Sequence, residues 1–302
     1  MLRFACLVTT LIASATVAAE PAEFATLPDL TYATVGDDKM KLDLVVPKGP
    51  GPHPCVVCFH GGAWKAGNRK DLTKPSLLSL GGDSKVKEFR LLEMLARKGY
   101  AAASVSYRLA PENKFPAQID DAKTAVRFLR TNAKKYDLDT ERFASLGFSS
   151  GGHLAALLGV TDSTAGFDGK LYPGVSSRVQ CVIDYFGPTD LSLFAQTPAL
   201  EDIFMVPLLG KECRTDAKLY AKASPVEYVT KAAPPTLIIH GNLDFIVPII
   251  HSERFHAKLK AAGVKTEFLV MNGRGHGWTG DDNEASAKAF VKFLDENLKK
   301  PK

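Results

Sequence analysis

The run Gly-Phe-Ser-Ser-Gly around Ser149 constrains the fold of this chain more than any other segment. It follows an apolar, strand-like stretch at residues 143–146 and precedes a helical pattern at residues 153–160. A serine that projects from a tight turn needs small neighbours two positions away on each side, because side chains there would collide. Gly147 and Gly151 meet that need. The run therefore predicts a strand, a strained turn that exposes the Ser149 hydroxyl, and a helix.

Ser149, rather than its neighbour Ser150, is the predicted nucleophile. A turn centred on Ser150 would put the bulky Phe148 at one of the two crowded positions. A serine hydroxyl is a weak nucleophile unless a nearby base removes its proton. The run also occurs by chance in loops. A catalytic interpretation therefore requires a base, an acid and an oxyanion-binding loop elsewhere in the chain.

A second turn of small residues follows the apolar run at residues 54–59, where the sequence is HGGAW. Small residues let backbone N–H groups approach the negative charge that develops on a carbonyl oxygen during acyl transfer. We expect the N–H groups of Gly62, Ala63 and Ser150 to form an oxyanion hole, the last of them at a helix amino terminus. Losing one such donor typically costs about 3 kcal/mol of transition-state stabilisation.

The candidate acid and base follow two further strand-like segments. Asp244 lies in a loop after the β-branched run at residues 235–239, and it is the candidate that orients the base. His276 lies between glycines after the run at residues 266–270, and it is the candidate base. The chain order of serine, acid and histidine is the order expected when all three lie on loops at the carboxyl ends of one parallel sheet.

These segments carry a family resemblance that extends from about residue 30 to the end. The chain resembles serine esterases of the α/β-hydrolase superfamily. HGGAW and the motifs YRLAPE at 107–112, FPA at 115–117 and DDA at 120–122 are similar to two groups. These groups are the hormone-sensitive-lipase-like esterases and the bacterial feruloyl and acetyl esterase-like (BD-FAE-like) esterases. The resemblance implies that Tyr107 and Arg108 brace the loop beneath the site.

The chain fits the second group better than the first. Hormone-sensitive-lipase-like enzymes usually carry a third glycine where this chain has Ala63, and a substantial helical cap before the first strand. Few residues precede the first strand here, and Phe148 stands where many relatives have an acid. The resemblance therefore implies an α/β-hydrolase fold, with a mostly parallel, doubly wound sheet of about eight strands and a small cap.

Alternating strand and helix patterns agree with this α/β class. A first hairpin is expected from residues 30–35 and 42–46. The later elements are a helix at 86–97, a strand at 101–106, a long helix at 117–136, a strand at 179–185 and an insertion at about 189–225 that could form the cap.

Three aromatic side chains are candidates for substrate contact. Phe204 belongs to an apolar group within the insertion, and Trp64 and Trp278 flank the expected site from two loops. Each could line a pocket or stack on an aromatic or sugar ring, and packing in the core is an equal alternative for each.

The amino terminus predicts export. Residues 1–19 combine Arg3, an apolar stretch and the sequence VAA before Glu20, which is typical of a cleaved secretory signal. The stretch is shorter than the roughly 20 apolar residues of a membrane-spanning helix, so no stable membrane anchor is expected. Residues 20–302 are then one hydrolase domain, secreted or periplasmic. The formal charge of +5 falls by one on cleavage, too mild a balance to predict nucleic-acid binding.

The cysteines and the remaining histidines predict neither disulfides nor a metal site. Cys55 and Cys58 share one strand and point to opposite faces, so they should be packing thiols, and Cys181 lies in an apolar strand. His251 and His256 are expected on the surface of one helix. No metal or organic cofactor is expected.

Three functions remain compatible with these residues. The first is a secreted carboxylesterase for short acyl or aryl esters, including acetyl or feruloyl esters linked to plant polysaccharide. A peptidase or amidase of the same fold is the second, and a non-catalytic binding member is the third. A binding-only member should have lost one of Ser149, Asp244 and His276, and all three are present. The sequence predicts no particular oligomeric state.

Overall fold

The computed structural model describes residues 23–73 and 90–299. The signal peptide expected at 1–19 lies outside these residues, and so does the start of the helix expected at 86–97. Within the described part, that helix is α1 (Leu91–Arg97).

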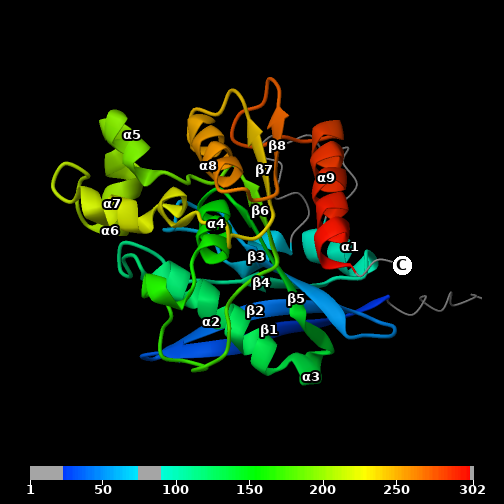
Figure 1. Cartoon of the computed structure of the whole chain (residues 1–302). Helices are drawn as coiled ribbons and strands as arrows, with labels where there is room; N and C mark the ends of the chain where they lie inside the picture. Colours follow the sequence, from blue (N-terminus) through cyan, green and yellow to red (C-terminus); the bar gives the residue numbers. More distant parts are fainter. Residues whose placement is uncertain (1–22, 74–89, 300–302) are drawn as a thin grey trace, which may run out of the picture.

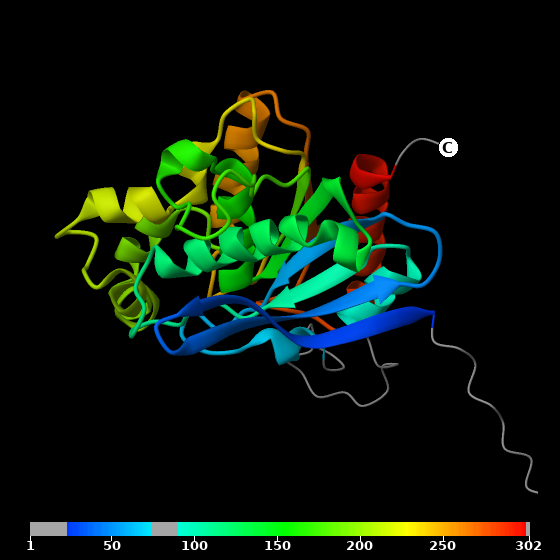
Figure 2. The ribbon, with the colours of Figure 1, turned by 90° about the horizontal axis from the view of Figure 1, so that it is seen from below.

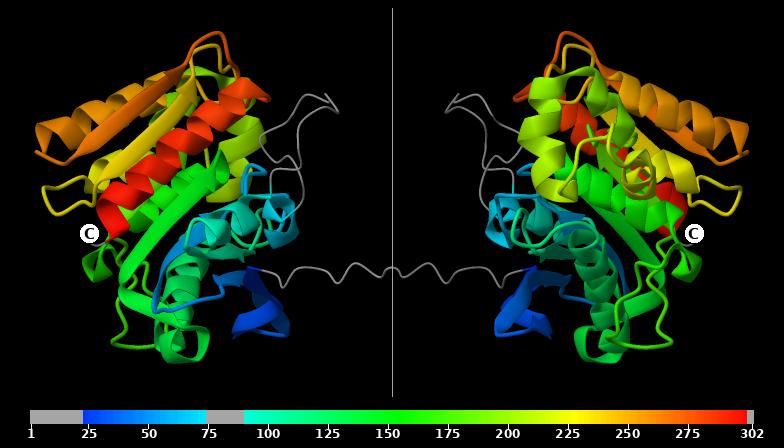
Figure 3. Two further views of the ribbon diagram at one scale, coloured as in Figure 1. Left: turned by 90° about the vertical axis from the view of Figure 1, so that its right-hand side faces the viewer. Right: turned by 90° about the vertical axis from the view of Figure 1, so that its left-hand side faces the viewer.

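Eight strands form one sheet in the order β1-β2-β4-β3-β5-β6-β7-β8. The β1–β2 and β2–β4 pairs are antiparallel, and every other pair of neighbouring strands is parallel. The β1–β2 hairpin forms one edge of the sheet and β8 the other, as the side views in Figure 3 and the view from below in Figure 2 show. The strands are β1 (Phe24–Val35), β2 (Asp38–Pro47), β3 (His53–Phe59), β4 (Ala101–Val105), β5 (Leu138–Phe148), β6 (Cys181–Tyr185), β7 (Thr236–Gly241) and β8 (Thr266–Met271).

Helices cover both faces of this sheet (Figure 1). On one face α1 and α9 (Asp281–Leu298) bury their apolar residues, and on the other α2 (Ala117–Thr131) and α4 (Ser150–Val160) do so. Another long helix, α8 (Ile250–Ala261), packs beside α4. Layers on both faces of a mostly parallel sheet confirm the α/β-hydrolase fold class that the sequence predicts.

The position of β3 inside the sheet explains why polar and apolar residues do not alternate along it. All seven of its residues are buried, since both faces of the strand meet helices. Cys55 packs into the core on the α2 and α4 face, whereas Cys58 packs into the core on the α1 and α9 face. The four cysteines of the described residues are free thiols, three of them buried, as the sequence predicts.

Two predicted boundaries differ from the structure. The helix expected at 117–136 is split at Asn132, whose side chain donates a hydrogen bond to the Phe128 carbonyl at 2.8 Å alongside its own backbone N–H. A second helix, α3 (Ala133–Tyr136), then ends at Asp137 in the left-handed conformation. The first hairpin is also longer than expected, because β1 begins at Phe24.

Short helices fill the chain between β6 and β7. They are η3 (Leu191–Gln196), α5 (Pro198–Leu200), a π-helical turn η4 (Glu201–Met205), α6 (Val206–Leu209), α7 (Ala217–Ala223) and η5 (Pro225–Tyr228). Two further short 3-10 turns are η1 (Arg69–Leu72) and η2 (Ser163–Ala165). In Figure 1 the insertion helices lie beside α4 and α8, at the opposite side of the molecule from α9.

One prediction about the histidines of α8 is wrong. The sequence predicts His251 at the surface, but only 1% of this residue is exposed. The Phe194 ring lies 5.1 Å from its ring, so the insertion covers the start of α8. Burial lowers the pKa of His251 to about 3. His256 is half-buried, with Nδ1 3.1 Å from the Thr266 hydroxyl.

Candidate active site

Ser149 lies at the turn between β5 and α4, and its backbone has φ 55° and ψ −121°. That left-handed φ is strained for a residue with a side chain, and it persists because the surroundings hold it. A Cβ on Gly147 would collide with the Gly151 carbonyl, and a Cβ on Gly151 would collide with the Phe59 carbonyl. The two glycines are therefore required by close packing of backbone, and the turn aims the Ser149 hydroxyl away from the sheet.

The structure brings the three residues of the predicted triad together. His276 Nε2 lies 2.9 Å from Ser149 Oγ, and His276 Nδ1 lies 2.7 Å from Asp244 Oδ2. The Asp244 side chain is fully buried, whereas 11% of the His276 side chain is exposed. Loops after β7 and β8 meet the elbow after β5, because carboxyl ends of parallel strands share one edge of the sheet.

Asp244 lies in a setting that favours the carboxylate form. Burial alone would raise its pKa, but hydrogen bonds from His240 and His276 and the backbone N–H of Val247 hold the pKa well below its usual range. The N–H of Ile246 also donates to Oδ1, at 2.9 Å. An ionised acid that accepts the Nδ1–H hydrogen leaves Nε2 free to accept the proton of Ser149.

The loop after β3 offers backbone donors on the other side of Ser149. Gly62 has φ 116° and Ala63 has φ 55°, so consecutive residues turn sharply. Among the described residues, nothing accepts a hydrogen bond from the N–H groups of Gly62, Ala63 or Ser150. A Cβ on Gly61 would lie 3.5 Å from the Ser149 Cβ, which places this loop directly against the elbow. The arrangement is suited to an oxyanion hole, and that role stays a prediction.

Tyr107 supports this loop directly, and Arg108 ties the neighbouring chain to α2. The Tyr107 hydroxyl donates to the His60 carbonyl at 2.9 Å, and its ring stacks on the His60 imidazole at 4.3 Å. The Arg108 backbone N–H and Nε both donate to the Asp121 carboxylate. Contacts of this kind fix the path of the chain, which agrees with the bracing role that the resemblance implies.

The two tryptophans considered for substrate contact lie in the core, which is the alternative that the sequence left equally open for both. Only 2% of Trp64 is exposed, and its indole N–H donates to His153 Nδ1 at 3.1 Å. Only 4% of Trp278 is exposed, and its indole N–H donates to the Ser286 hydroxyl. An indole N–H usually finds a partner when it is buried, and both have found theirs inside the protein.

Phe204 remains a candidate for substrate contact. It is half-buried in η4, where its ring lies 6.1 Å from Phe194. Lys65 follows the predicted oxyanion loop directly, and its Nζ donates to the Ile203 carbonyl at 2.7 Å and lies 5.8 Å from the Phe204 ring. The insertion therefore borders the loop that carries Gly62 and Ala63.

Sequence reasoning missed two residues around the imidazole and the acid. The Phe186 ring lies 4.7 Å from the His276 ring, and the buried His240 contacts Asp244. Phe186 follows β6 and His240 lies inside β7, and in such apolar runs an aromatic or a lone histidine is usually a core residue. The only available signal was that each strand leads into a loop at the predicted site.

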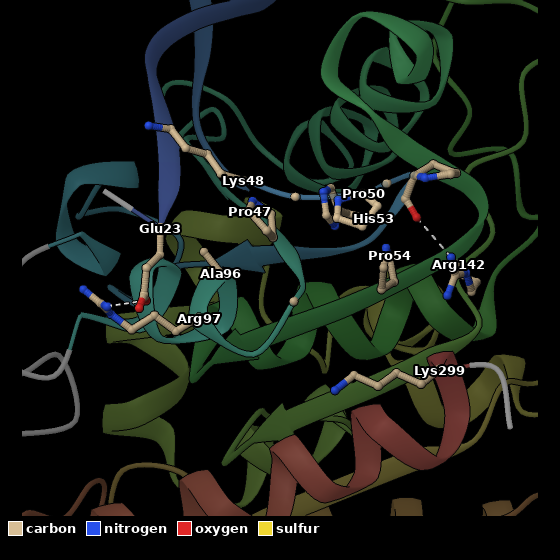
Figure 4. A pocket seen from close by; sticks show the side chains of 14 residues that line it. Glu23, Pro47, Lys48, Pro50, His53, Pro54, Ala96, Arg97, Arg142 and Lys299 are labelled. Carbon is tan, nitrogen blue, oxygen red and sulfur yellow. Dashed lines mark hydrogen bonds and ion pairs between the residues drawn. The ribbon is translucent and has the colours of Figure 1, made fainter. Parts of the chain in front are cut away.

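A cavity of about 680 Å³ lies away from these residues. Its lining includes His53, the first residue of β3, whereas the predicted oxyanion loop follows the last residue of that strand, about 20 Å further along. Figure 4 shows Glu23 paired with Arg97 in its wall. Since it contains none of the triad residues, it is not a binding pocket for an ester that reacts at Ser149.

Residues 23–73 and 90–299 contain neither a candidate metal cluster nor a candidate membrane-spanning helix. No group of three or more His, Cys, Asp or Glu side chains there could hold a metal ion. No helix in those two ranges is long and apolar enough to cross a membrane.

The sheet, the elbow and the Ser149, His276 and Asp244 geometry define an α/β-hydrolase. The BD-FAE family model matches residues 42–259, and the chain belongs to this family. The resemblance predicted from the sequence is thus confirmed.

Relatives and solved structures agree with this assignment. Esterase LipC of Mycobacterium tuberculosis is 29% identical over 81% of this chain and 59% of LipC. A truncated carbohydrate esterase from gut microbiota superposes with a TM-score of 0.77, at 29% identity, over 93% of this chain and 99% of that one. A bifunctional GH43-CE protein of Bacteroides eggerthii gives a TM-score of 0.76 at 33% identity, over 90% of this chain and 38% of that one. The chain spans about half the length of the curated relatives it matches.

Proposed function

We propose that this protein is a serine carboxylesterase that works through an acyl-enzyme intermediate. The observation that carries the proposal is the continuous hydrogen-bonded array from Ser149 through His276 to the buried Asp244, beside backbone N–H groups that have no acceptor within residues 23–73 and 90–299. Membership of the BD-FAE family and the similarity to proteins named esterases support it.

The first half of the reaction forms the acyl-enzyme. His276 Nε2 takes the Ser149 proton while Oγ attacks the ester carbonyl carbon, and Asp244 stabilises the imidazolium that results. The carbonyl oxygen becomes an oxyanion and accepts hydrogen bonds from the predicted oxyanion hole. When the tetrahedral intermediate collapses, His276 returns the proton to the departing alcohol oxygen, and the acyl group stays on Ser149.

The second half regenerates the serine. His276 takes a proton from a water molecule, whose oxygen attacks the acyl carbon in place of the alcohol. The same N–H groups stabilise the second oxyanion. Collapse breaks the bond to Oγ, His276 returns its proton to Ser149, and the carboxylic acid leaves.

We further propose that the substrates are short-chain acyl or aryl esters, including acetyl or feruloyl esters attached to plant polysaccharide. Two similar structures support this class, because one is described as a carbohydrate esterase and the other as a bifunctional GH43-CE protein. The insertion also borders the predicted oxyanion loop through the Lys65 contacts, where it can limit the length of an acyl chain. Phe204 is the aromatic side chain that we propose contacts that chain, and its position beside Lys65 supports the proposal.

A panel of esters tests the substrate class. We expect kcat/KM to be highest for p-nitrophenyl acetate, lower for the butyrate and lowest for the octanoate, with release of acetate from acetylated xylan or turnover of methyl ferulate. p-Nitroacetanilide, an amide with the same acyl group, should be turned over far more slowly than the acetate ester. Preferred cleavage of the amide would favour the peptidase or amidase alternative, and a preference for octanoate would contradict the short-chain proposal.

We also propose that the protein is exported and cleaved after Ala19. The support is the charged, apolar and small-residue pattern of residues 1–19. Amino-terminal sequencing of the protein from periplasmic and culture fractions should give Glu20 as the first residue. A cytoplasmic protein that keeps Met1 would contradict this proposal.

A further inference from the structure

A buried histidine outside the Ser149, His276 and Asp244 array contacts the acid directly. His240 is the fifth residue of β7, and its side chain is completely buried. Its Nε2 lies 3.2 Å from Asp244 Oδ2 and 2.8 Å from the Val247 carbonyl oxygen. Its Nδ1 lies 2.6 Å from the Ser252 hydroxyl in α8. One ring therefore joins β7, the acid loop and α8.

The partners of His240 define which ring nitrogen carries hydrogen. A carbonyl oxygen and an ionised carboxylate can only accept hydrogen bonds. Nε2 must therefore carry hydrogen and donate to Val247 and Asp244. Nδ1 can then accept the hydrogen of the Ser252 hydroxyl. The serine hydroxyl can donate or accept, so it adapts to this ring form and supports it without touching Asp244 itself.

His240 completes the set of donors around Asp244. Oδ1 accepts the backbone N–H groups of Ile246 and Val247, each at 2.9 Å. Oδ2 accepts from both His276 and His240, at 2.7 and 3.2 Å. Two donors on each oxygen prevent rotation of the carboxylate. They also divide the charge of Oδ2 between the two imidazoles.

We propose that His240 is a positioning residue for the hydrolysis, holding Asp244 Oδ2 in the direction of His276 and setting how strongly that carboxylate attracts the imidazolium. This inference rests on the proposed esterase function. Loss of the His240 donor frees Asp244 to turn away from His276, which lowers kcat. When Asp244 and His276 do pair in such a variant, Oδ2 interacts with His276 alone. Its full charge then stabilises the protonated imidazolium, which is the inactive form of the base.

Several charged or titratable groups face this ring pair and bear on its pH dependence. Asp184 in β6 interacts electrostatically with His240, and burial raises the pKa of Asp184 to about 6. His251 in α8 interacts with both His240 and Asp244. Asp190 and Arg254 pair at 2.7 Å and both act on His251. None of these residues is replaced in a variant at His240 or Ser252. His240→Phe and His240→Gln both remove the electrostatic effect of His240 on Asp184 and His251, so a comparison of these two variants isolates the hydrogen bond to Asp244.

His240→Phe, His240→Gln and Ser252→Ala test the proposal. Phenylalanine keeps the ring volume and removes both polar contacts, whereas glutamine can still donate to Asp244 and accept from Ser252. We expect His240→Phe to lower kcat about 10- to 100-fold with KM little changed, the range found when a residue that orients a metal-ligating side chain is replaced. The acidic limb of its kcat/KM profile should move to higher pH. His240→Gln should restore most of kcat, and Ser252→Ala should shift both quantities in the same direction by less.

Each rate is divided by the concentration of active sites, titrated with a p-nitrophenyl phosphate triester that phosphorylates the reactive serine. His256→Phe makes the same exchange in α8, at a residue that contacts Thr266 and not Asp244, and it should keep the wild-type kcat and pH profile. A His240→Phe protein with wild-type kcat per site and an unmoved acidic limb would overturn the proposal, even if fewer molecules were folded. If that variant does not fold, Ser252→Ala decides, and wild-type values for it overturn the proposal. Full turnover by Ser149→Ala would instead overturn the esterase function itself.

Discussion

Replacing Ser149 by alanine should lower kcat for p-nitrophenyl acetate by about a millionfold, because the triad acts as a unit and loss of its nucleophile removes the whole covalent route. The residual rate above that of water should come from the oxyanion hole and substrate binding. Folding should be retained, since alanine can occupy the same backbone position. Steady-state rates and circular dichroism at matched concentration measure the two effects.

Ser150→Ala is the matched control for this change. The Ser150 side chain lies 3.4 Å from the Tyr107 hydroxyl, and what it offers to the predicted oxyanion hole is its backbone N–H, which alanine keeps. We therefore expect kcat of this variant to stay within about tenfold of wild type, a loss no larger than one weak hydrogen bond explains. If Ser150→Ala were the inactive protein and Ser149→Ala the active one, the nucleophile would be wrongly assigned.

The sequence predicts those parts of the site that depend on backbone space. At Gly147 and Gly151 a side chain would strike backbone carbonyl groups, so only glycine is compatible with the elbow. The positions of Asp244 and His276 also follow from the chain, because both come after strand-like runs whose carboxyl ends must share one edge of a parallel sheet.

The parts that the sequence could not predict depend on which segments pack on one another. Trp64 is a large aromatic in a loop at the site. Its burial depends on its contact with His153, which is far away in the sequence and becomes evident in the folded chain. His251 has the spacing of a surface residue until the insertion is placed over the start of α8. His240 has the signature of a core histidine, and its contact with Asp244 depends on how the chain turns back after β7.

Asp244→Asn should lower kcat by about ten thousandfold, the effect of the same change in serine proteases. Four N–H groups face the carboxylate, two at each oxygen. A carboxamide has one oxygen, so its NH2 group must face one of these pairs of donors. If the oxygen stays with the backbone N–H groups, the NH2 group faces His276. His276 must then accept at Nδ1 and carry its hydrogen on Nε2, where it cannot take the proton of Ser149.

The same variant should change the pH dependence of stability. The folded state holds the pKa of Asp244 below its unfolded value, so the ionised carboxylate stabilises the fold above about pH 4, and this contribution is lost as the pH falls through the lowered pKa. The melting temperature of Asp244→Asn should therefore lie below that of wild type at neutral pH, with a gap that narrows in acid. Asp282→Asn only removes a pair with Arg274 beside the histidine loop. Its activity and its melting temperature should stay near the wild-type values at neutral and at acidic pH. Full activity of Asp244→Asn would show that another carboxylate orients His276, and a gap that widened in acid would mean that the folded state does not favour the ionised form.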